Sequence, residues 1–271
     1  MRMAGVGHAV FAATAIALGI LGLVQGDLLQ AWEVPKGLPG RAALAYACAC
    51  ICLGGGIGLF WRRSAALAAR ALLALFVLLT LLFKARFVFL QPTVEGTYQS
   101  LGENAVVVAG AWVLYAWFAT EWDRRHIGFA TGEKGVRVAR VLYALAMIAF
   151  GLSHFAYLNL TAPLVPAWLP WHVGWAYFTG GAYLAAGVAM LVGVWARLAA
   201  VLSTAQMGGF TLLVWVPMMA TGHMSAFQQG EFVVSWALTA AGCVVADSYR
   251  GMPWLRLSGG ARQGSRTPSP G

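Results

Sequence analysis

The chain is a succession of long apolar runs separated by short polar segments. Each run is about 20 residues long, the length at which a helix rising 1.5 Å per residue crosses a hydrocarbon core of about 30 Å. The apolar residues are continuous rather than alternating, which argues against membrane-spanning strands. The pattern therefore predicts an all-α membrane protein with eight transmembrane helices, at about residues 4–24, 42–61, 65–90, 104–121, 138–158, 172–195, 197–219 and 231–249.

The first and third runs carry additional expectations. The first run has spanning length and no small-residue cleavage site after it, so we expect it to remain as a helix rather than to act as a removable signal. The third run has about 25 residues, more than a straight crossing needs. It should therefore tilt, kink or project from the bilayer.

Landmarks in the first four runs recur in the last four, with a period of about 128–134 residues. Four spans per unit is an even number, so the two units would share one orientation and form a parallel repeat of two four-helix bundles. We expect a first unit over 1–122, a cytoplasmic linker over 123–137, a second unit over 138–250 and a disordered tail over 251–271. The matched landmarks are Gly22 and Gly151, Leu38-Pro39 and Leu169-Pro170, Trp61-Arg62-Arg63 and Trp195-Ala196-Arg197, and Gly102-Glu103 and Gly230-Glu231.

The basic residues are distributed unevenly between the two sides of the predicted bundle. Of the 18 Lys and Arg residues, only Lys36, Arg41, Lys84 and Arg86 fall on one side. Cytoplasmic loops of membrane proteins are enriched in Lys and Arg, so we expect the richer side, with both termini, to face the cytoplasm of a cell inner membrane. The residues of that side are Arg2, Arg62, Arg63, Arg70, Arg124, Arg125, Lys134, Arg137, Arg140, Arg197, Arg250, Arg256, Arg262 and Arg266.

Composition agrees with lipid as the main solvent of the chain. Hydrophobic residues make up 60% and charged residues 10%, with a mean hydropathy of +0.73, whereas a soluble domain carries about 25% charged residues. The net charge of +9 does not indicate nucleic-acid binding, because the basic residues lie at the ends of apolar runs rather than in one patch with interleaved aromatic residues. We expect the lipid bilayer, and no nucleic acid, as a partner.

The second unit resembles the DoxX family of small four-helix membrane proteins. The resemblance rests on a proline-punctuated loop that leads into a glycine-rich helix, on the turn formed by Gly193, Arg197, Leu198, Ala199 and Ala200, and on Gly230-Glu231. It implies a membrane subunit associated with quinone-linked or thiol redox chemistry. Where the family commonly has a glutamate in its second helix, this chain reads Gly181-Ala182-Tyr183, a departure that bears on any chemistry using that carboxylate.

Titratable residues gather at the predicted outer face of the second unit. His154 ends one run, His172 opens the next, His223 lies between the last two, and Glu231 opens the last. Polar groups at membrane depth are candidates for function, and a carboxylate or imidazole there could contact a quinone headgroup. Trp175, beside a loop without charged residues, is a further candidate for ligand contact. The alternative is that these residues only cap helix ends and line the headgroup zone.

In the first unit, Lys84 and Arg86 interrupt the third apolar run near its outer end. Each cation could extend to the interface, or one could form an ion pair with Glu103 or with Asp27, Glu33 or Glu95. Cys48 and Cys52 share a helix face while Cys50 points away, a pattern typical of small apolar packing residues or, alternatively, of a thiol site. No residue spacing indicates a metal site.

Three functions are compatible with these patterns, and the sequence assigns no catalytic residue. The leading hypothesis is a redox-associated membrane subunit, within a redox complex, that binds a quinone or another hydrophobic small molecule near its outer face. A second is a small-molecule or lipid transporter that uses the parallel repeat as its moving unit. A third is a non-catalytic membrane scaffold, and each of the three is compatible with a homo-oligomer.

Overall fold

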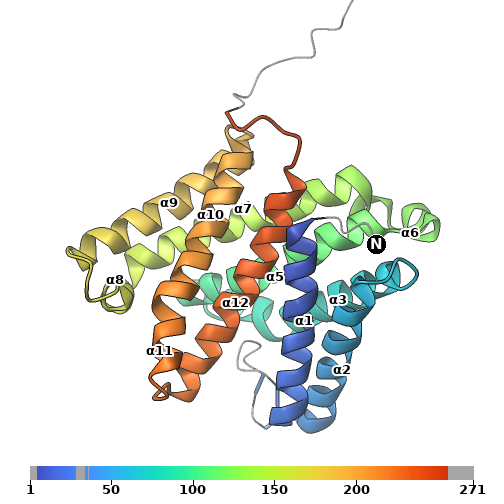
Figure 1. Ribbon diagram of the computed structural model, residues 1–271, viewed down its shortest axis with the longest axis horizontal. Coiled ribbons are helices and arrows are strands. Elements are labelled where there is room, and N and C mark those ends of the chain that lie inside the picture. The colour runs from blue at the N-terminus through green and yellow to red at the C-terminus, as the bar shows by residue number, and fades with distance from the viewer. Residues whose placement is uncertain (1–4, 29–33, 36, 256–271) are drawn as a thin grey trace, which may run out of the picture.

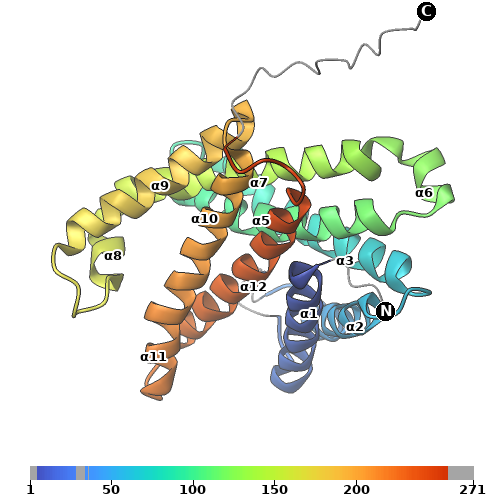
Figure 2. The ribbon, with the colours of Figure 1, turned by 45° about the horizontal axis from the view of Figure 1, so that its top comes forward.

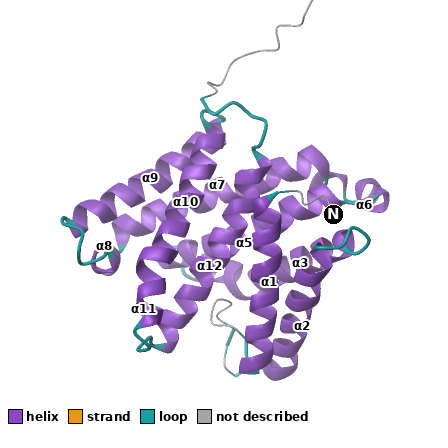
Figure 3. Cartoon of the chain, in the orientation of Figure 1, coloured by secondary structure: helices purple, strands orange, loops and turns teal. Residues whose placement is uncertain are grey.

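The computed structural model describes residues 5–28, 34–35 and 37–255. All regular secondary structure within these ranges is helical, and no strand occurs among them (Figure 3). Eight helices there are long and apolar enough to cross a membrane, which confirms the prediction of an all-α, multi-pass membrane protein.

Six of the spans are single helices and two are composite. The single helices are α1 (Val6–Gln25), α2 (Arg41–Leu59), α5 (Glu95–Phe118), α7 (Gly132–Ala156), α9 (His172–Val192) and α12 (Ala226–Ser248). The composite spans are α3 (Ala65–Leu79), η2 (Thr80–Ala85) and α4 (Arg86–Leu90), and α10 (Ala196–Phe210), η5 (Thr211–Trp215) and α11 (Val216–Ala220). Short helices α6 (Glu121–His126), η3 (Gly128–Ala130), α8 (Leu158–Thr161) and η4 (Ala162–Leu164) lie between spans.

Both composite spans contain a π-helical segment at the same place. Each segment opens with a threonine whose hydroxyl donates to the carbonyl four residues earlier, Thr80 to Phe76 at 2.6 Å and Thr211 to Met207 at 2.9 Å. π-Helical turns are rare and frequently mark functional positions in helices. The first of them interrupts the long third run, where the sequence predicts a tilt, a kink or a projection.

The helices pack in the same order in the two halves of the chain. In the first half α1 packs on α2, α2 on α3 and α3 on α5, and in the second half α7 packs on α9, α9 on α10 and α10 on α12. The halves meet through α5 against α7, α12 against α1 and α5 against α12 (Figure 1). Helices α6 and α8 lie at opposite ends of the molecule, joined by α7 (Figure 2).

Glycines allow the first two helices of each half to cross closely. A Cβ at Gly56 of α2 would lie 2.7 Å from the carbonyl oxygen of Ala12 in α1. A Cβ at Gly187 of α9 would lie 2.6 Å from the carbonyl oxygen of Ala144 in α7, about one predicted repeat period further on. Backbone-to-backbone contact of this kind is how membrane helices associate without a hydrophobic driving force.

Three helices begin earlier than the sequence predicts. Helix α5 starts at Glu95 instead of residue 104, α7 at Gly132 instead of 138, and α12 at Ala226 instead of 231. The added turns contain polar residues that side-chain contacts stabilise in the protein, for example the Ser225 capping box of α12. Over residues 123–137, where the sequence predicts a linker, the chain forms most of α6, η3 and the start of α7, and Asp123 is buried.

Arginine–tryptophan contacts secure the segment that follows the last helix of each half. In the first clamp, Arg70 of α3 lies over the Trp122 ring at 5.3 Å and donates to Asp123. In the second clamp, Arg197 of α10 lies over the Trp254 ring at 4.0 Å and donates to the carbonyl of Met252 at 2.8 Å. The start of the expected disordered tail therefore packs on α10, and its residues from 256 onward lie outside the described part of the chain.

Candidate functional site

A cavity of about 360 Å³ lies among α7, α9, the α10–η5 span and α12, and α5 of the first half forms part of its wall. This volume is within the range of small-molecule sites, which are mostly apolar with a few placed polar groups. The wall has that composition. Its aromatic members are Phe150, Trp175, Tyr183, Phe210 and Trp215, and its polar members are Gln99, Glu103, Ser153, His154, Thr161, Thr179, Gln206, Glu231 and Ser235.

The two glutamates in the wall come from different halves of the chain. Glu103 lies on α5 and Glu231 on α12, and both are half-buried. Gln99, one turn before Glu103, donates to its carboxylate at 3.4 Å. A second, much smaller cavity of about 20 Å³ adjoins Glu103 on the side of α1. Glu103 therefore lies where the two halves meet, between the two cavities.

His154 is held in one tautomer by its own helix. Its Nδ1 lies 2.7 Å from the carbonyl oxygen of Phe150, and because a carbonyl can only accept, Nδ1 carries the proton. Nε2 of the neutral ring is then a hydrogen-bond acceptor. The ring also packs against Tyr183, with 5.6 Å between the ring centroids. The second half thus presents a fixed imidazole acceptor in the cavity wall.

Several hydrogen-bond donors in the wall are already engaged within the protein. Gln206 Nε2 donates to the carbonyl of Thr179 at 2.9 Å, and Thr179 Oγ1 donates to the carbonyl of Trp175 at 2.9 Å. Ser153 Oγ contacts both the Glu95 carboxylate and the carbonyl of Ala149, and it donates its single proton to one of them. These contacts commit hydrogen-bonding groups of the wall to partners within the protein itself.

The indole N–H of Trp215 is a buried donor in the wall that is not engaged within the described part of the protein. Its side chain is 3% exposed, and its indole Nε1 has no hydrogen-bond partner among the described residues. Trp215 ends the π-helical segment η5 and packs edge-on against Phe210, with 5.8 Å between centroids. A buried polar group without a partner is costly, so an unsatisfied N–H in the wall of a cavity indicates a place for a ligand acceptor.

The structure brings together part of the predicted ligand set. His154, Glu231 and Trp175 line the cavity, and Glu103, predicted only as an ion-pair partner, lines it with them. His172 and His223 are not among the lining residues: the first is half-buried at the start of α9 and the second is exposed in the turn before α12. Sequence reasoning did not identify Trp215 and Tyr183 as site residues, because nothing in the sequence marks the π-helical turn that sets Trp215.

Lys84 and Arg86 of the first half take different positions. Lys84 is 2% exposed in η2, and its Nζ donates to Ser100 Oγ of α5 at 2.6 Å, one turn before Glu103. Arg86 is exposed and lies over the ring of Phe87, 4.8 Å from its centroid. Of the other predicted partners, Asp27 accepts from Arg41 at 2.6 Å, and Glu33 lies outside the described residues.

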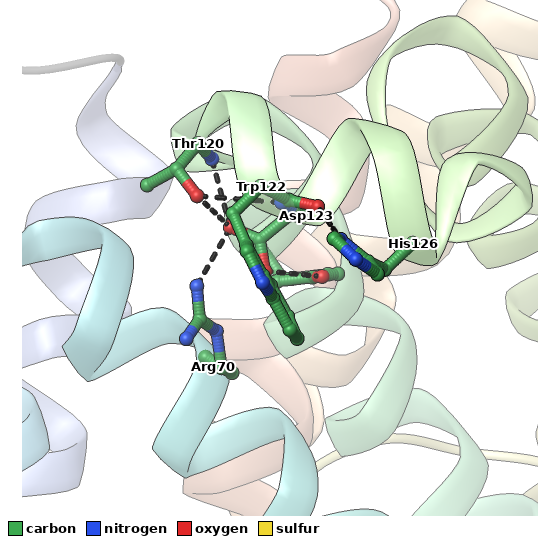
Figure 4. Close-up of polar contacts among 6 residues, drawn as sticks. Arg70, Thr120, Trp122, Asp123 and His126 are labelled. Carbon is green, nitrogen blue, oxygen red and sulfur yellow. Dashed lines mark hydrogen bonds and ion pairs between the residues drawn. The ribbon is translucent and has the colours of Figure 1, made fainter.

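A second polar cluster surrounds Asp123 at the start of α6 (Figure 4). The carboxylate accepts from Arg70 Nη2 at 2.8 Å, from Tyr115 at 2.9 Å, and from the amide and hydroxyl of Thr120 at 2.8 and 2.6 Å. Burial on its own raises the pKa of Asp123, but these hydrogen bonds outweigh it and hold the pKa well below its usual range. Because the protein itself occupies the acceptors of this carboxylate, the cluster is an anchor for α6 rather than a ligand site.

Among the described residues, no group of three or more His, Cys, Asp or Glu side chains has an arrangement that could hold a metal ion. Helix α2 buries Cys48 and Cys52 and exposes Cys50, and all three are free thiols. The cavity is therefore the site whose geometry points to a small organic molecule.

Comparisons extend the description no further. No protein-family model, no curated protein and no solved structure matches this chain.

Proposed function

We propose that the protein is a redox-associated membrane subunit that binds a quinone-type hydrophobic molecule in the cavity near its outer face. The observation that carries the proposal is the wall itself, in which five aromatic side chains line the cavity together with polar groups that include His154, Glu103 and Glu231. An aromatic ring with polar substituents matches such a wall, because the flat faces pack on aromatic side chains and the substituents meet the polar groups.

We further propose that the chain is DoxX-like and that it lies in the inner membrane with both termini in the cytoplasm. Similar packing order, similar π-helical segments and similar glycine crossings in the two halves support a duplicated, DoxX-like four-helix unit. The basic ends of the helices support an inner-membrane orientation with both termini in the cytoplasm. In this orientation, Glu103 and Glu231 of the cavity wall lie near the outer ends of α5 and α12.

Native mass spectrometry of the purified protein tests the proposal. The wild-type protein should retain a quinone-sized adduct, or take one up from an added short-chain benzoquinone. The variant Glu231→Gln should lose at least about tenfold in affinity, since hydrogen bonds to charged groups are worth about 1.5–3 kcal/mol. The control Glu121→Gln changes an exposed carboxylate of α6, outside the cavity, and should bind as the wild type does. Absence of any adduct and of uptake would contradict the proposal.

Transport is the second candidate, and one observation favours it. The cavity is lined by α5 from the first half and by four spans of the second, so a rocking motion between the halves would change its shape. A transporter should accumulate a labelled hydrophobic substrate in proteoliposomes. A binding subunit should show saturable binding without accumulation.

A further inference from the structure

We infer that the cavity opens sideways to the bilayer, through a mouth between α9 and the η5–α11 part of the next span. The ligand would carry a hydrocarbon tail that leaves the cavity through this mouth. The inference rests on the proposed function and specifies the ligand of that same site as an amphiphile dissolved in the membrane, with a ring-sized head and a long apolar chain.

Two exposed side chains mark the mouth. Of the residues that line the cavity, only Trp175 of α9 and Leu213 of η5 are exposed on the surface of the described protein, at 37% and 52%. The other lining residues are buried or half-buried, for example Tyr183, about two turns further along α9, and Met207 of α10. The wall of the cavity therefore runs from the interior to the surface along two neighbouring spans.

The two spans separate around this mouth. Helix α9 packs on α10, and Gln206 of α10 donates to the carbonyl of Thr179 of α9 at 2.9 Å. No comparable packing joins α9 to η5 or α11 among the described residues. The first turn of α9, which lies beside α8, stands apart from α11 in both views (Figure 1, Figure 2). Gly209 lines the cavity between Gln206 and Leu213, and a Cβ there would meet no other part of the chain within 4 Å.

The mouth lies within the membrane-spanning part of the protein. Trp175 is in the first turn of α9, and Leu213 lies about two turns before the end of its span at Ala220. Neither α9 nor the η5–α11 segment contains an Asp, Glu, Lys or Arg residue. Hydrocarbon can lie against such a surface without leaving a charge in contact with lipid. A ligand therefore reaches the cavity from the bilayer.

The size of the cavity decides how the ligand is arranged. A volume of about 360 Å³ is near the lower end of the range for small-molecule sites, so it holds a substituted ring but not a long chain beside it. The chain must then pass between Trp175 and Leu213. Outside the mouth it contacts lipid, which avoids the cost of exposing apolar surface to water.

Photo-crosslinking of the purified protein in lipid nanodiscs tests the position of the mouth. The probe is a benzoquinone whose decyl chain carries a diazirine, and the competitor is the same ring with a methyl group in place of the chain. On illumination, the chain should label α9 and η5 close to Trp175 and Leu213, and excess competitor should abolish this labelling. Labelling that is spread evenly over the lipid-facing helices, or that is confined to other spans, would overturn the inference.

Affinity measurements on two neighbouring variants test whether the chain occupies the mouth. Leu213→Trp should weaken binding of the decyl probe about tenfold, because the chain and the larger side chain compete for the same space. Binding of the methyl-substituted ring should change by less than about twofold, since it has no chain there. The control Leu212→Trp changes an exposed neighbour on η5 that does not line the cavity, and it should leave both affinities unchanged. Equal weakening of both probes by Leu213→Trp would contradict a tail in the mouth.

The outcomes separate the inference from the proposed function. Binding of the methyl-substituted ring, without labelling of α9 and η5 by the chain, would overturn the inference and leave the proposed binding function standing. Binding of neither probe to the wild-type protein would overturn both.

Discussion

The third span of the first half and the third span of the second half share a backbone and differ in what they bury. Each turns from α-helix to π-helix at a threonine, and each buries the side chain four residues later. That side chain is Lys84 in the first half and Trp215 in the second. The lysine donates to α5 in a closely packed interface, whereas the tryptophan forms part of the wall of a cavity.

The difference shows how two spans with similar backbones can make different contacts. A π-helical turn shifts the side chains that follow it around the helix, and it does so in the same way in both halves. In the first half, the shifted position delivers a cation to the junction with α5. In the second half, it delivers an indole to the site. The backbone is therefore the common element, and the buried side chain four residues after the threonine contacts α5 in the first half and lines the cavity in the second.

Placing the lysine of the first half at the tryptophan position of the second half should have the largest effect on stability. Trp215→Lys removes a large buried ring and places an ammonium in a mostly apolar wall, so we expect a loss of about 3–5 kcal/mol in the free energy of unfolding. Unfolding of the purified protein by SDS in mixed micelles measures it. Wild-type stability of this variant would show that the two π-helical positions are interchangeable and would break the comparison.

The two arginine–tryptophan clamps should show the next largest difference between the halves. Only the first clamp contains a carboxylate, and Asp123→Ala removes the acceptor for Arg70, Tyr115 and Thr120, which should cost about 3 kcal/mol. In the second clamp, Arg197→Gln removes one hydrogen bond to a carbonyl and a ring contact, and should cost about 1–2 kcal/mol. A smaller loss for Asp123→Ala than for Arg197→Gln would contradict this order.

The first clamp also has a defined pH dependence. The pKa of Asp123 is lower in the folded protein than its usual value of about 3.9, so the carboxylate contributes stability that is fully present above that value. The contribution is lost as pH falls toward the lower, folded pKa. The stability difference between wild type and Asp123→Asn should therefore be constant from about pH 8 to 5 and should narrow below about pH 4. A difference that grows on acidification would be the wrong sign for this geometry.

Removal of the buried cation should have a moderate effect. Lys84→Met keeps most of the side-chain volume but leaves Ser100 without its charged donor, for an expected loss of about 1–2 kcal/mol. The matched variant Arg86→Met changes an exposed neighbour in the same span and should be close to neutral. Equal effects at the two positions would indicate that burial of Lys84 has no consequence for the first half.

The threonines that open the π-helical segments should give the smallest effects. Thr80→Val and Thr211→Val each remove one hydroxyl bond to a helix carbonyl, worth about 1 kcal/mol. Thr211 also contacts the hydroxyl of Thr239 at 3.2 Å, so its variant should lose slightly more. A strongly unequal pair of losses would mean that the two segments are maintained by different contacts.

Much of the fold could be predicted because a membrane-spanning helix requires a long, uninterrupted run of apolar residues, which is visible in the sequence. The third run was expected over 65–90, and the composite span occupies Ala65–Leu90. The prediction failed at the start of α5, where Glu95, Gln99 and Glu103 made the sequence read as a loop. These residues recur every fourth position, so they share one helix face. Glu95 contacts Ser153 of α7, and Gln99 and Glu103 line the cavity.

The candidate site could be predicted only in part, because the sequence does not show which side chains converge in space. His154 and Glu231 stood out because titratable residues are rare at membrane depth. His172 and His223 stood out equally, but sequence position at a helix end does not say which side chains converge. Trp215 was hidden because it lies in an apolar stretch, and only the three-dimensional path of the π-helical turn brings it to the wall.

The contribution of α5 to the cavity has a consequence for the independence of the two halves. One wall of the site in the second half comes from the first half, so the last four spans on their own would leave the chamber incomplete. A polypeptide limited to those spans would need another helix in the place of α5 to close it.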